Sequence, residues 1–174
     1  MKRIFLILIT MIGFWISADA QMFSEKQQEI IDSGQGIVIN GIIWATGNVQ
    51  NGEFVKPNEP GIRPDWERAQ KACPKGWRLP TYEELEELIN AGSEWTTTPI
   101  NGCFFGSGNN RIFLPAAGAR LPYKNRVNDM GKRGYYWCST VSRDSDFCLL
   151  FGDKFSRVAR NTRGYGFSVR CVAE

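Results

Sequence analysis

The segment CPKGWRLPT, residues 73–81, constrains the fold most strongly, because it cannot itself be helical yet lies between two segments with helical patterns. Its two prolines and one glycine turn the chain and do not prolong a helix. Trp77 and Leu79 are expected to enter the core, and Arg78 between them is expected to point outward or to pair with a helix carboxylate. The segment therefore predicts a tight connection between two helices rather than the lining of an active site.

Both flanking helices have a recognisable start. The first begins with Asp65 as its N-cap and has apolar residues at helical spacing over residues 66–72. The second begins at Thr81, which together with Glu84 has the sequence pattern of a capping box. The apolar stripe of the second helix consists of Leu85, Leu88 and Ile89.

The first twenty residues have the composition of a secretory signal peptide. A basic start is followed by the apolar run IFLILITMIGFWI, and ADA at 18–20 matches a cleavage site before Gln21. An uncleaved membrane anchor is the alternative, but the run is shorter than the ~20 residues that a span needs. We therefore expect an exported protein, periplasmic, at the cell surface or extracellular, with no membrane span in its mature form. Residues 21–35 are then an N-terminal extension, and residues 36–174 are a single domain.

The rest of the chain has the pattern of short strands and loops. Asn40-Gly41 between apolar runs predicts a hairpin, and the glycine- and proline-rich residues 47–64 predict a surface loop. Further strands are expected at 111–118, 135–140, 146–151, 155–159 and 166–173. Two short helices with a mostly antiparallel sheet place the chain in the α+β class.

The chain contains no histidine. This excludes Ser-His-Asp and Cys-His nucleophile pairs, histidine-ligated zinc and imidazole proton shuttles. The carboxylates Asp144 and Asp146 lie two residues apart in a turn, where such residues usually serve the turn geometry. We therefore expect a protein that is not an enzyme and that carries no cofactor.

The charged residues are distributed unevenly. Residues 21–110 carry 7 Lys and Arg against 12 Asp and Glu, whereas residues 111–174 carry 12 against 5. One interpretation is a basic face for an anionic partner; the other is that acidic helices and basic strands of one domain solvate one another. The basic residues form no long run, so we expect no nucleic-acid partner.

Five motifs occur in the order found in a known family. They are NGIIWATGNV, CPKGWRLPTYEELEEL, FLPAAGAR, GYYWCST and GFSVRCVAE, and the match covers about residues 36–174. In this order they resemble the Fibrobacter major paralogous domain, a family of exported bacterial domains regarded as a branch of the C-type-lectin-like fold. The resemblance implies two short helices, a mostly antiparallel mixed sheet whose N- and C-terminal strands pair, and long loops. It implies no established activity.

The five cysteines are an odd number, and spacing alone leaves 15 arrangements of two disulfides and one free thiol. In C-type-lectin-like domains the end of the first helix is tied to the last strand, which implies a Cys73–Cys171 disulfide in this chain. A second disulfide, Cys138–Cys148, is then expected between adjacent strands, although the family usually has Ser near position 138. Cys103 is expected to remain a free, buried thiol.

The resemblance also indicates a binding loop. In lectin-like folds the ligand lies on long loops before the later strands, and residues 119–134 correspond to this region. Basic residues there suit an anionic sugar, and Tyr123 is an aromatic residue that could stack on a sugar ring. A solvated basic loop is the alternative. The candidate ligand-binding residues are Arg120, Tyr123, Lys124, Asn125, Arg126, Asn128 and Asp129.

Calcium is a disfavoured alternative for this loop. The ion takes 6–8 oxygen ligands, usually including several carboxylates, and Asp129 is the only carboxylate between residues 119 and 134. The Glu-Pro-Asn and Trp-Asn-Asp signatures of calcium-dependent lectins are missing. We therefore expect a site without a metal.

These observations favour a non-catalytic binding module that recognises a glycan or a protein surface. A structural or tip subunit of a bacterial surface assembly is the alternative. A remote alternative is an enzyme related to formylglycine-generating enzymes, which share the fold and use a copper-binding cysteine pair. The oligomeric state is not predicted by any of these patterns.

Overall fold

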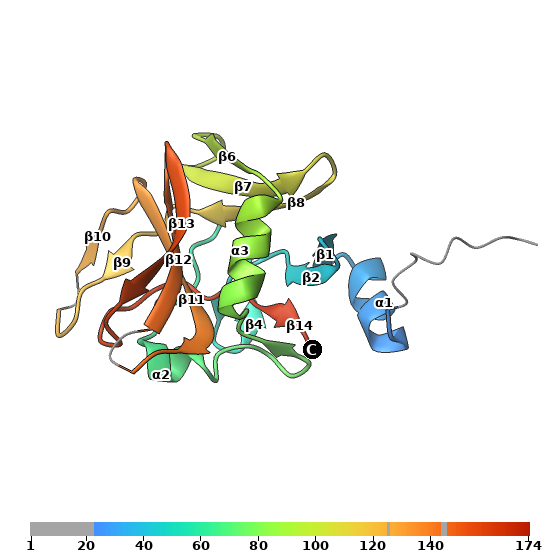
Figure 1. Cartoon of the computed structure of the whole chain (residues 1–174), viewed down its shortest axis with the longest axis horizontal. Coiled ribbons are helices and arrows are strands. Elements are labelled where there is room, and N and C mark those ends of the chain that lie inside the picture. The colour runs from blue at the N-terminus through green and yellow to red at the C-terminus, as the bar shows by residue number, and fades with distance from the viewer. Residues whose placement is uncertain (1–22, 125, 144–145) are drawn as a thin grey trace, which may run out of the picture.

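The computed structural model describes residues 23–124, 126–143 and 146–174. These residues form three short helices and fourteen strands, which are arranged in several small antiparallel sheets (Figure 1). The α+β class is thereby confirmed. The expected signal peptide, residues 1–20, lies outside the described residues. Within the described ranges, no helix is long and apolar enough to cross a membrane.

The helices are α1 (Glu25–Asp32), α2 (Trp66–Ala69) and α3 (Tyr82–Asn90). The last two are the expected pair. The Asp65 side chain caps α2, and Thr81 and Glu84 form both hydrogen bonds of the predicted capping box of α3. A third helix, α1, was not predicted and lies in the N-terminal extension. Ser24 and Gln27 form a second capping box there, so a helix signal was present in the sequence.

The N- and C-terminal strands of the domain share one sheet. It contains β1 (Gly36–Ile39), β2 (Ile42–Ala45), β14 (Val172–Ala173) and β5 (Trp77–Arg78), in this order. Asn40 and Gly41 join β1 to β2 with φ angles of 49° and 78°, as expected of an Asn-Gly hairpin. The pairing of β2 with β14 agrees with the pairing of terminal strands that the resemblance implied.

The remaining strands form four sheets. The sheet with the longest strands contains β11 (Arg133–Val141), β12 (Asp146–Gly152) and β13 (Phe155–Asn161). A second three-stranded sheet contains β6 (Ser93–Thr96), β7 (Gly102–Ser107) and β8 (Asn110–Pro115). Two short ribbons pair β3 (Val49–Gln50) with β4 (Glu53–Phe54) and β9 (Ala119–Arg120) with β10 (Val127–Asn128).

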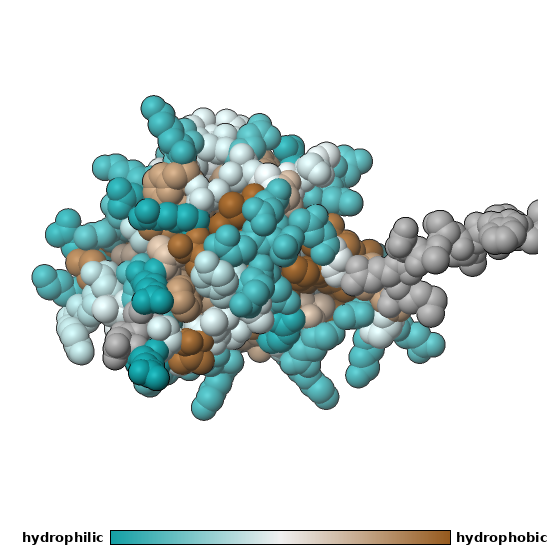
Figure 2. All heavy atoms as spheres, viewed as in Figure 1, coloured by the Kyte–Doolittle hydropathy of each residue, from teal (hydrophilic) through white to brown (hydrophobic). Residues whose placement is uncertain are grey.

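Strands β11 and β12 divide the core into two layers. Successive side chains of a strand point to opposite faces, so Trp137 and Cys148 lie in one layer while Tyr136 and Leu149 lie in the other. Helix α3 crosses the second layer (Figure 1) and buries Leu85 in it. On the face shown in Figure 2, hydrophilic residues cover most of the surface, with smaller hydrophobic areas between them.

Cys73 and Cys171 form a disulfide bond, as the resemblance implied. The bond joins the segment after α2 to the segment just before β14, and Cys171 is fully buried. Cys103, in β7, is a free and buried thiol. The disulfide therefore ties the connection between the two predicted helices to the end of the chain.

The expected Cys138–Cys148 disulfide is wrong, because both residues are free, buried thiols. The residue opposite Cys148 on the neighbouring strand is Trp137, so Cys138 follows on the other face of the sheet. The Cys138 thiol donates a hydrogen bond to the Phe147 carbonyl at 3.3 Å. The sulfur of Cys148 accepts one from the Asn161 amide at 3.4 Å. The adjacency of two strands did not predict this disulfide correctly, because a disulfide also needs its two side chains on the same face of the sheet.

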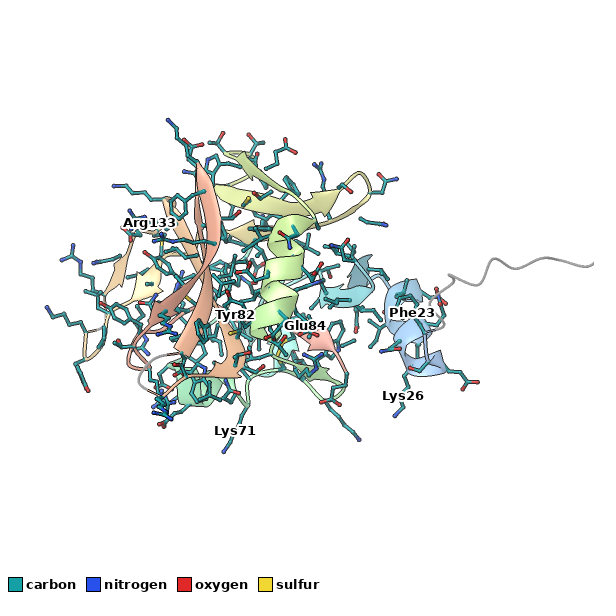
Figure 3. The ribbon with its side chains drawn as sticks, viewed as in Figure 1. Phe23, Lys26, Lys71, Tyr82, Glu84 and Arg133 are labelled. Atoms are coloured by element: carbon teal, nitrogen blue, oxygen red, sulfur yellow. A yellow bond between two sulfur atoms is a disulfide. The ribbon has the colours of Figure 1, made fainter. Side chains whose placement is uncertain are left out.

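Residues 73–81 have the structural role that their sequence predicts. Trp77 and Leu79 are buried. Between them, the guanidinium of Arg78 forms two hydrogen bonds to the carboxylate of Glu84, at 2.6 and 2.7 Å. Glu84 also accepts a hydrogen bond from the Thr81 N–H at 2.7 Å, and Figure 3 places it in the first turn of α3. Arg78 therefore connects the turn to the start of the helix.

Glu84→Gln is expected to remove part of the protein's acid sensitivity. Burial opposes ionisation of Glu84, but hydrogen bonds from Arg78 and Thr81 outweigh it and hold the pKa below its usual value of 4.5. A carboxylate with a lowered folded-state pKa stabilises the fold above its unfolded-state pKa, and this contribution is lost as pH falls through the folded-state value. Glutamine preserves the capping box, so the variant should be less stable by about 1 kcal/mol at pH 7. Urea unfolding at several pH values should show the difference shrinking as the pH falls below the usual glutamate value of 4.5; a constant difference would contradict this assignment.

A charged side chain lies in the core without a charged partner. Arg170 is 1% exposed and donates hydrogen bonds of 2.9 Å to the Asn48 amide oxygen and to the carbonyls of Ala45 and Phe113. Among the described residues, no carboxylate pairs with it. Burial lowers the pKa of Arg170 to about 10, and the neighbouring Tyr136 opposes this effect. Neutral oxygen acceptors therefore hold this guanidinium in place.

The segment at 47–64 is not simply a surface loop, because it contains the β3–β4 ribbon and begins at a fully buried side chain, Asn48. The amide nitrogen of Asn48 donates to the Pro60 carbonyl at 3.0 Å and to the Tyr136 hydroxyl at 3.2 Å. Tyr136 in turn donates to the Pro115 carbonyl at 2.9 Å. These hydrogen bonds fix the exposed segment near residue 60 to the core and to the buried end of β8.

Candidate functional site

Tyr123 lies in the turn between β9 and β10 with an unusual backbone conformation. Its φ angle is 56°, and the Lys124 N–H donates to the Leu121 carbonyl at 3.4 Å. With Pro122 before it, Tyr123 occupies the third position of a type II turn, where glycine is usual. The other non-glycine residues with positive φ in the described ranges are Asn or Asp, which tolerate this conformation.

The side chain of Tyr123 is not packed against the core. The residue is fully exposed, with a relative accessibility of 103%. A bulky residue in the left-handed region costs about 1–2 kcal/mol, and here no buried contact offsets that cost. A strained residue with an exposed aromatic ring is therefore a candidate for function rather than for stability.

Tyr123 stands at the edge of a cleft of about 410 Å³. Three segments that are distant in sequence form its walls: the start of α2, the β9 turn and the segment after β13. The lining residues are Asp65, Glu67, Arg68, Arg120, Tyr123, Arg163 and Gly164. The tertiary fold therefore joins two of the predicted binding residues, Arg120 and Tyr123, with five residues that were not predicted.

Arg163 is held rigidly in the wall of this cleft. Its Nε lies 2.7 Å from a carboxylate oxygen of Asp146, which is fully buried. Its guanidinium also lies 4.7 Å from the ring centre of Trp66. Because 45% of the Arg163 side chain is exposed, the guanidinium can present N–H groups to a ligand without first becoming ordered.

Arg120 is the arginine of this cleft whose charge is not paired with a carboxylate in the described part of the chain. Two backbone hydrogen bonds of 2.8 and 2.9 Å join it to Gly166, and its Nε donates to the Arg63 carbonyl at 3.2 Å. A Cβ at Gly166 would lie 2.6 Å from that Nε, so glycine permits this close approach. Arg68, by contrast, pairs with Asp65 at 3.5 Å.

Those of the other predicted binding residues that the structure describes do not line the cleft. Lys124 and Arg126 are exposed on the same turn, and Asn125 lies outside the described residues. Asn128 belongs to β10, opposite Ala119. The predicted loop is therefore not a single site.

Asp129 already has two partners within the protein. Its carboxylate accepts a hydrogen bond of 2.8 Å from the Tyr135 hydroxyl and lies 3.7 Å from the Arg133 guanidinium. A search of the described residues finds no group of three or more Cys, Asp or Glu placed to hold a metal ion. Asp129 contributes to the structure of the turn before β11 and does not face the Arg120–Tyr123 cleft.

The cleft combines an exposed aromatic ring, guanidinium donors and carboxylate acceptors. Arg120 and Arg163 offer N–H groups in a planar arrangement that matches a carboxylate. Glu67 is exposed and can accept hydrogen bonds from hydroxyl groups. This combination suits a ligand that has hydroxyl groups, an acidic group and a ring face.

Known proteins were compared with the whole chain. No family model, no curated protein and no solved structure matches it. The Fibrobacter major paralogous domain and the C-type-lectin-like fold therefore remain predictions, and the cleft is interpreted from its own residues.

The three free thiols are poorly suited to catalysis. Burial raises the pKa of Cys103 and of Cys148 to about 12 and that of Cys138 to about 11. All three are therefore protonated at neutral pH, whereas the nucleophile and metal ligand is the thiolate. Of the carboxylates Asp144 and Asp146, the first lies outside the described residues and the second is paired with Arg163.

Sequence reasoning missed the two other arginines and the carboxylates that line the cleft. Asp65 was recognised only as a helix cap, and Arg163 lies between two strand predictions. Neither belongs to a motif for binding. The one local signal was Pro122 followed by Tyr123, since a Pro-x turn that needs a positive φ normally has glycine or asparagine at x.

Proposed function

We propose that the protein is a non-catalytic, exported binding module that holds an acidic glycan in the Arg120–Tyr123 cleft. In this arrangement the ring of Tyr123 stacks on a sugar ring. The guanidinium of Arg120 binds the acidic group of the sugar, and Glu67 accepts hydrogen bonds from sugar hydroxyls. The fold that carries the cleft is proposed to be C-type-lectin-like, in accordance with the five ordered motifs.

The conformation of Tyr123 is the observation that carries this proposal. An aromatic ring that is fully exposed on a backbone with a φ of 56° lowers stability and contributes no packing. Aromatic residues of this kind bind ligands through a large apolar face and a polar hydroxyl. The rigid arginine beside it, Arg163, supports a site that is ordered before the ligand arrives.

Three further observations support a binding role in an exported protein. The chain lacks histidine, and its three described free thiols are buried and protonated at neutral pH. The Cys73–Cys171 disulfide is compatible with an oxidising compartment.

A glycan array probed with the purified protein tests the proposal. We expect binding to glycans that carry a carboxylate-bearing sugar, and weaker binding to their neutral counterparts. Arg120→Gln should remove the preference for acidic glycans, because it removes the unpaired positive charge. Tyr123→Ala should weaken binding by about tenfold or more.

Phe155→Ala provides the matched control. Phe155 is also an exposed aromatic residue, at 41%, but it does not line the Arg120–Tyr123 cleft. This variant should bind as the wild-type protein does. The absence of any glycan signal above background, with and without calcium, would show the proposed function to be wrong.

A further inference from the structure

A second cavity, of about 530 Å³, lies on another part of the molecule and has a mostly apolar lining. Ile100, in the connection between β6 and β7, and Met130, before β11, lie at its surface with 37% and 61% of their areas exposed. Ala116 and Ala117, after β8, form another part of the lining. Exposed apolar residues that gather at one cavity are typical of ligand sites.

Among the described residues that line this cavity, the charged group is the guanidinium of Arg63. Its Nε donates to the Ala117 carbonyl at 2.9 Å. Its Nη2 is buried and has no hydrogen-bond acceptor among the described residues. The cavity lining contains no Asp or Glu, and in the described ranges no carboxylate pairs with Arg63. Burial lowers the pKa of Arg63, as expected of a cation that lacks a counter-charge.

The walls of the cavity are fixed by hydrogen bonds. The Asn101 amide donates to the Gly131 carbonyl at 2.7 Å, and the Gly131 N–H donates to the Ala116 carbonyl at 2.7 Å. On the other side, the buried Asn48 amide holds the Pro60 carbonyl at 3.0 Å. The cavity is therefore formed before a ligand arrives, so that little ordering is needed on binding.

We propose that this cavity binds a small molecule that has an apolar body and a single carboxylate. The volume lies within the range of about 300–1,000 Å³ that is usual for small-molecule sites. The apolar lining would cover the body, and the carboxylate would supply the counter-charge that Arg63 lacks. An uncharged apolar ligand would leave the guanidinium in the same unpaired state, which is costly in a desolvated site.

Octanoate and octanol provide a matched pair of probes, because they share an apolar chain and differ in the carboxylate. Calorimetric titration of the purified protein should show octanoate binding at least about tenfold more tightly than octanol. In the wild-type protein, octanoate should shift the NMR signal of the Met130 methyl group, which locates binding at this cavity. Equal affinity for the two probes, or an unshifted Met130 signal up to the solubility limit of octanoate, would overturn the proposal.

Three variants separate the charge effect from a general loss of structure. Met130→Glu places a carboxylate at the mouth of the cavity and should weaken octanoate binding by about tenfold while changing octanol binding little. Val141→Glu is the control, because Val141 is equally exposed, at 60%, and does not line the cavity. Arg63→Gln should reduce the affinity for octanoate to that for octanol. A Val141→Glu effect as large as that of Met130→Glu would contradict the assignment.

These experiments are independent of the glycan array. Tyr123 and Arg120 do not line the Arg63 cavity, and Met130 does not line the Arg120–Tyr123 cleft. Tyr123→Ala should therefore leave octanoate binding unchanged. A protein that binds octanoate but no glycan would retain this inference and lose the proposed function.

Discussion

Reduction of the Cys73–Cys171 disulfide is expected to lower the free energy of unfolding by about 4–5 kcal/mol. The bond joins residues 98 positions apart, so it removes a large part of the conformational freedom of the unfolded chain. Since domains of this size are usually stable by about 5–15 kcal/mol, the loss would be a large fraction of the total. Urea unfolding with and without a reductant measures it, and a loss below about 1 kcal/mol would contradict the expectation.

The double variant Cys73→Ser, Cys171→Ser is the control for this experiment. The remaining cysteines are free thiols, so the stability of the double variant should not respond to the reductant. Thiol counting in denaturant without reductant should find three free thiols, those of Cys103, Cys138 and Cys148. A count of one would restore the Cys138–Cys148 disulfide and contradict the arrangement of side chains on β11 and β12.

Arg170→Met is expected to destabilise the protein by about 3 kcal/mol. The substitution leaves the buried oxygens of Asn48, Ala45 and Phe113 without their donor, and each such loss costs about 1–3 kcal/mol. Removal of an unpaired buried charge offsets part of this cost. The net effect is destabilising because three acceptors depend on one side chain.

Urea unfolding of Arg170→Met and of Arg157→Met compares a buried with an exposed arginine. Arg157 lies exposed in β13, so its substitution should change stability by at most about 0.5 kcal/mol. If Arg170→Met were as stable as the wild-type protein, the prediction would be wrong. The free-energy cost of burying the cation would then equal the stabilisation from its hydrogen bonds.

The features predicted correctly are those whose cause is local in sequence. The Asp65 cap, the Thr81–Glu84 capping box and the Asn40-Gly41 hairpin each depend on a few neighbouring residues. The buried positions of Trp77 and Leu79 were also predicted, although the segment forms the short strand β5 and not only a turn. The Cys73–Cys171 disulfide was implied by family resemblance and not by spacing.

The features missed depend on contacts between distant residues. The hydrogen bond between Asn48 and Arg170 spans 122 positions, and nothing near Asn48 indicates that it is buried. The faces of Cys138 and Cys148 depend on the register of β11 against β12, which strand prediction does not give. The Arg120–Tyr123 cleft is likewise assembled from three separated segments, of which only one was predicted as a site.

Tyr123→Gly separates stability from binding at the proposed site. Glycine adopts the positive φ of this turn without strain, so the variant should be more stable than the wild-type protein by about 0.5–1 kcal/mol, net of the added freedom of its unfolded chain. It also lacks the ring, so its affinity for acidic glycans should fall by about tenfold or more. Unfolding and glycan binding measured on the same sample should therefore change in opposite directions. A Tyr123→Gly protein that is folded and binds glycans as tightly as the wild-type protein would contradict the assignment of the cleft.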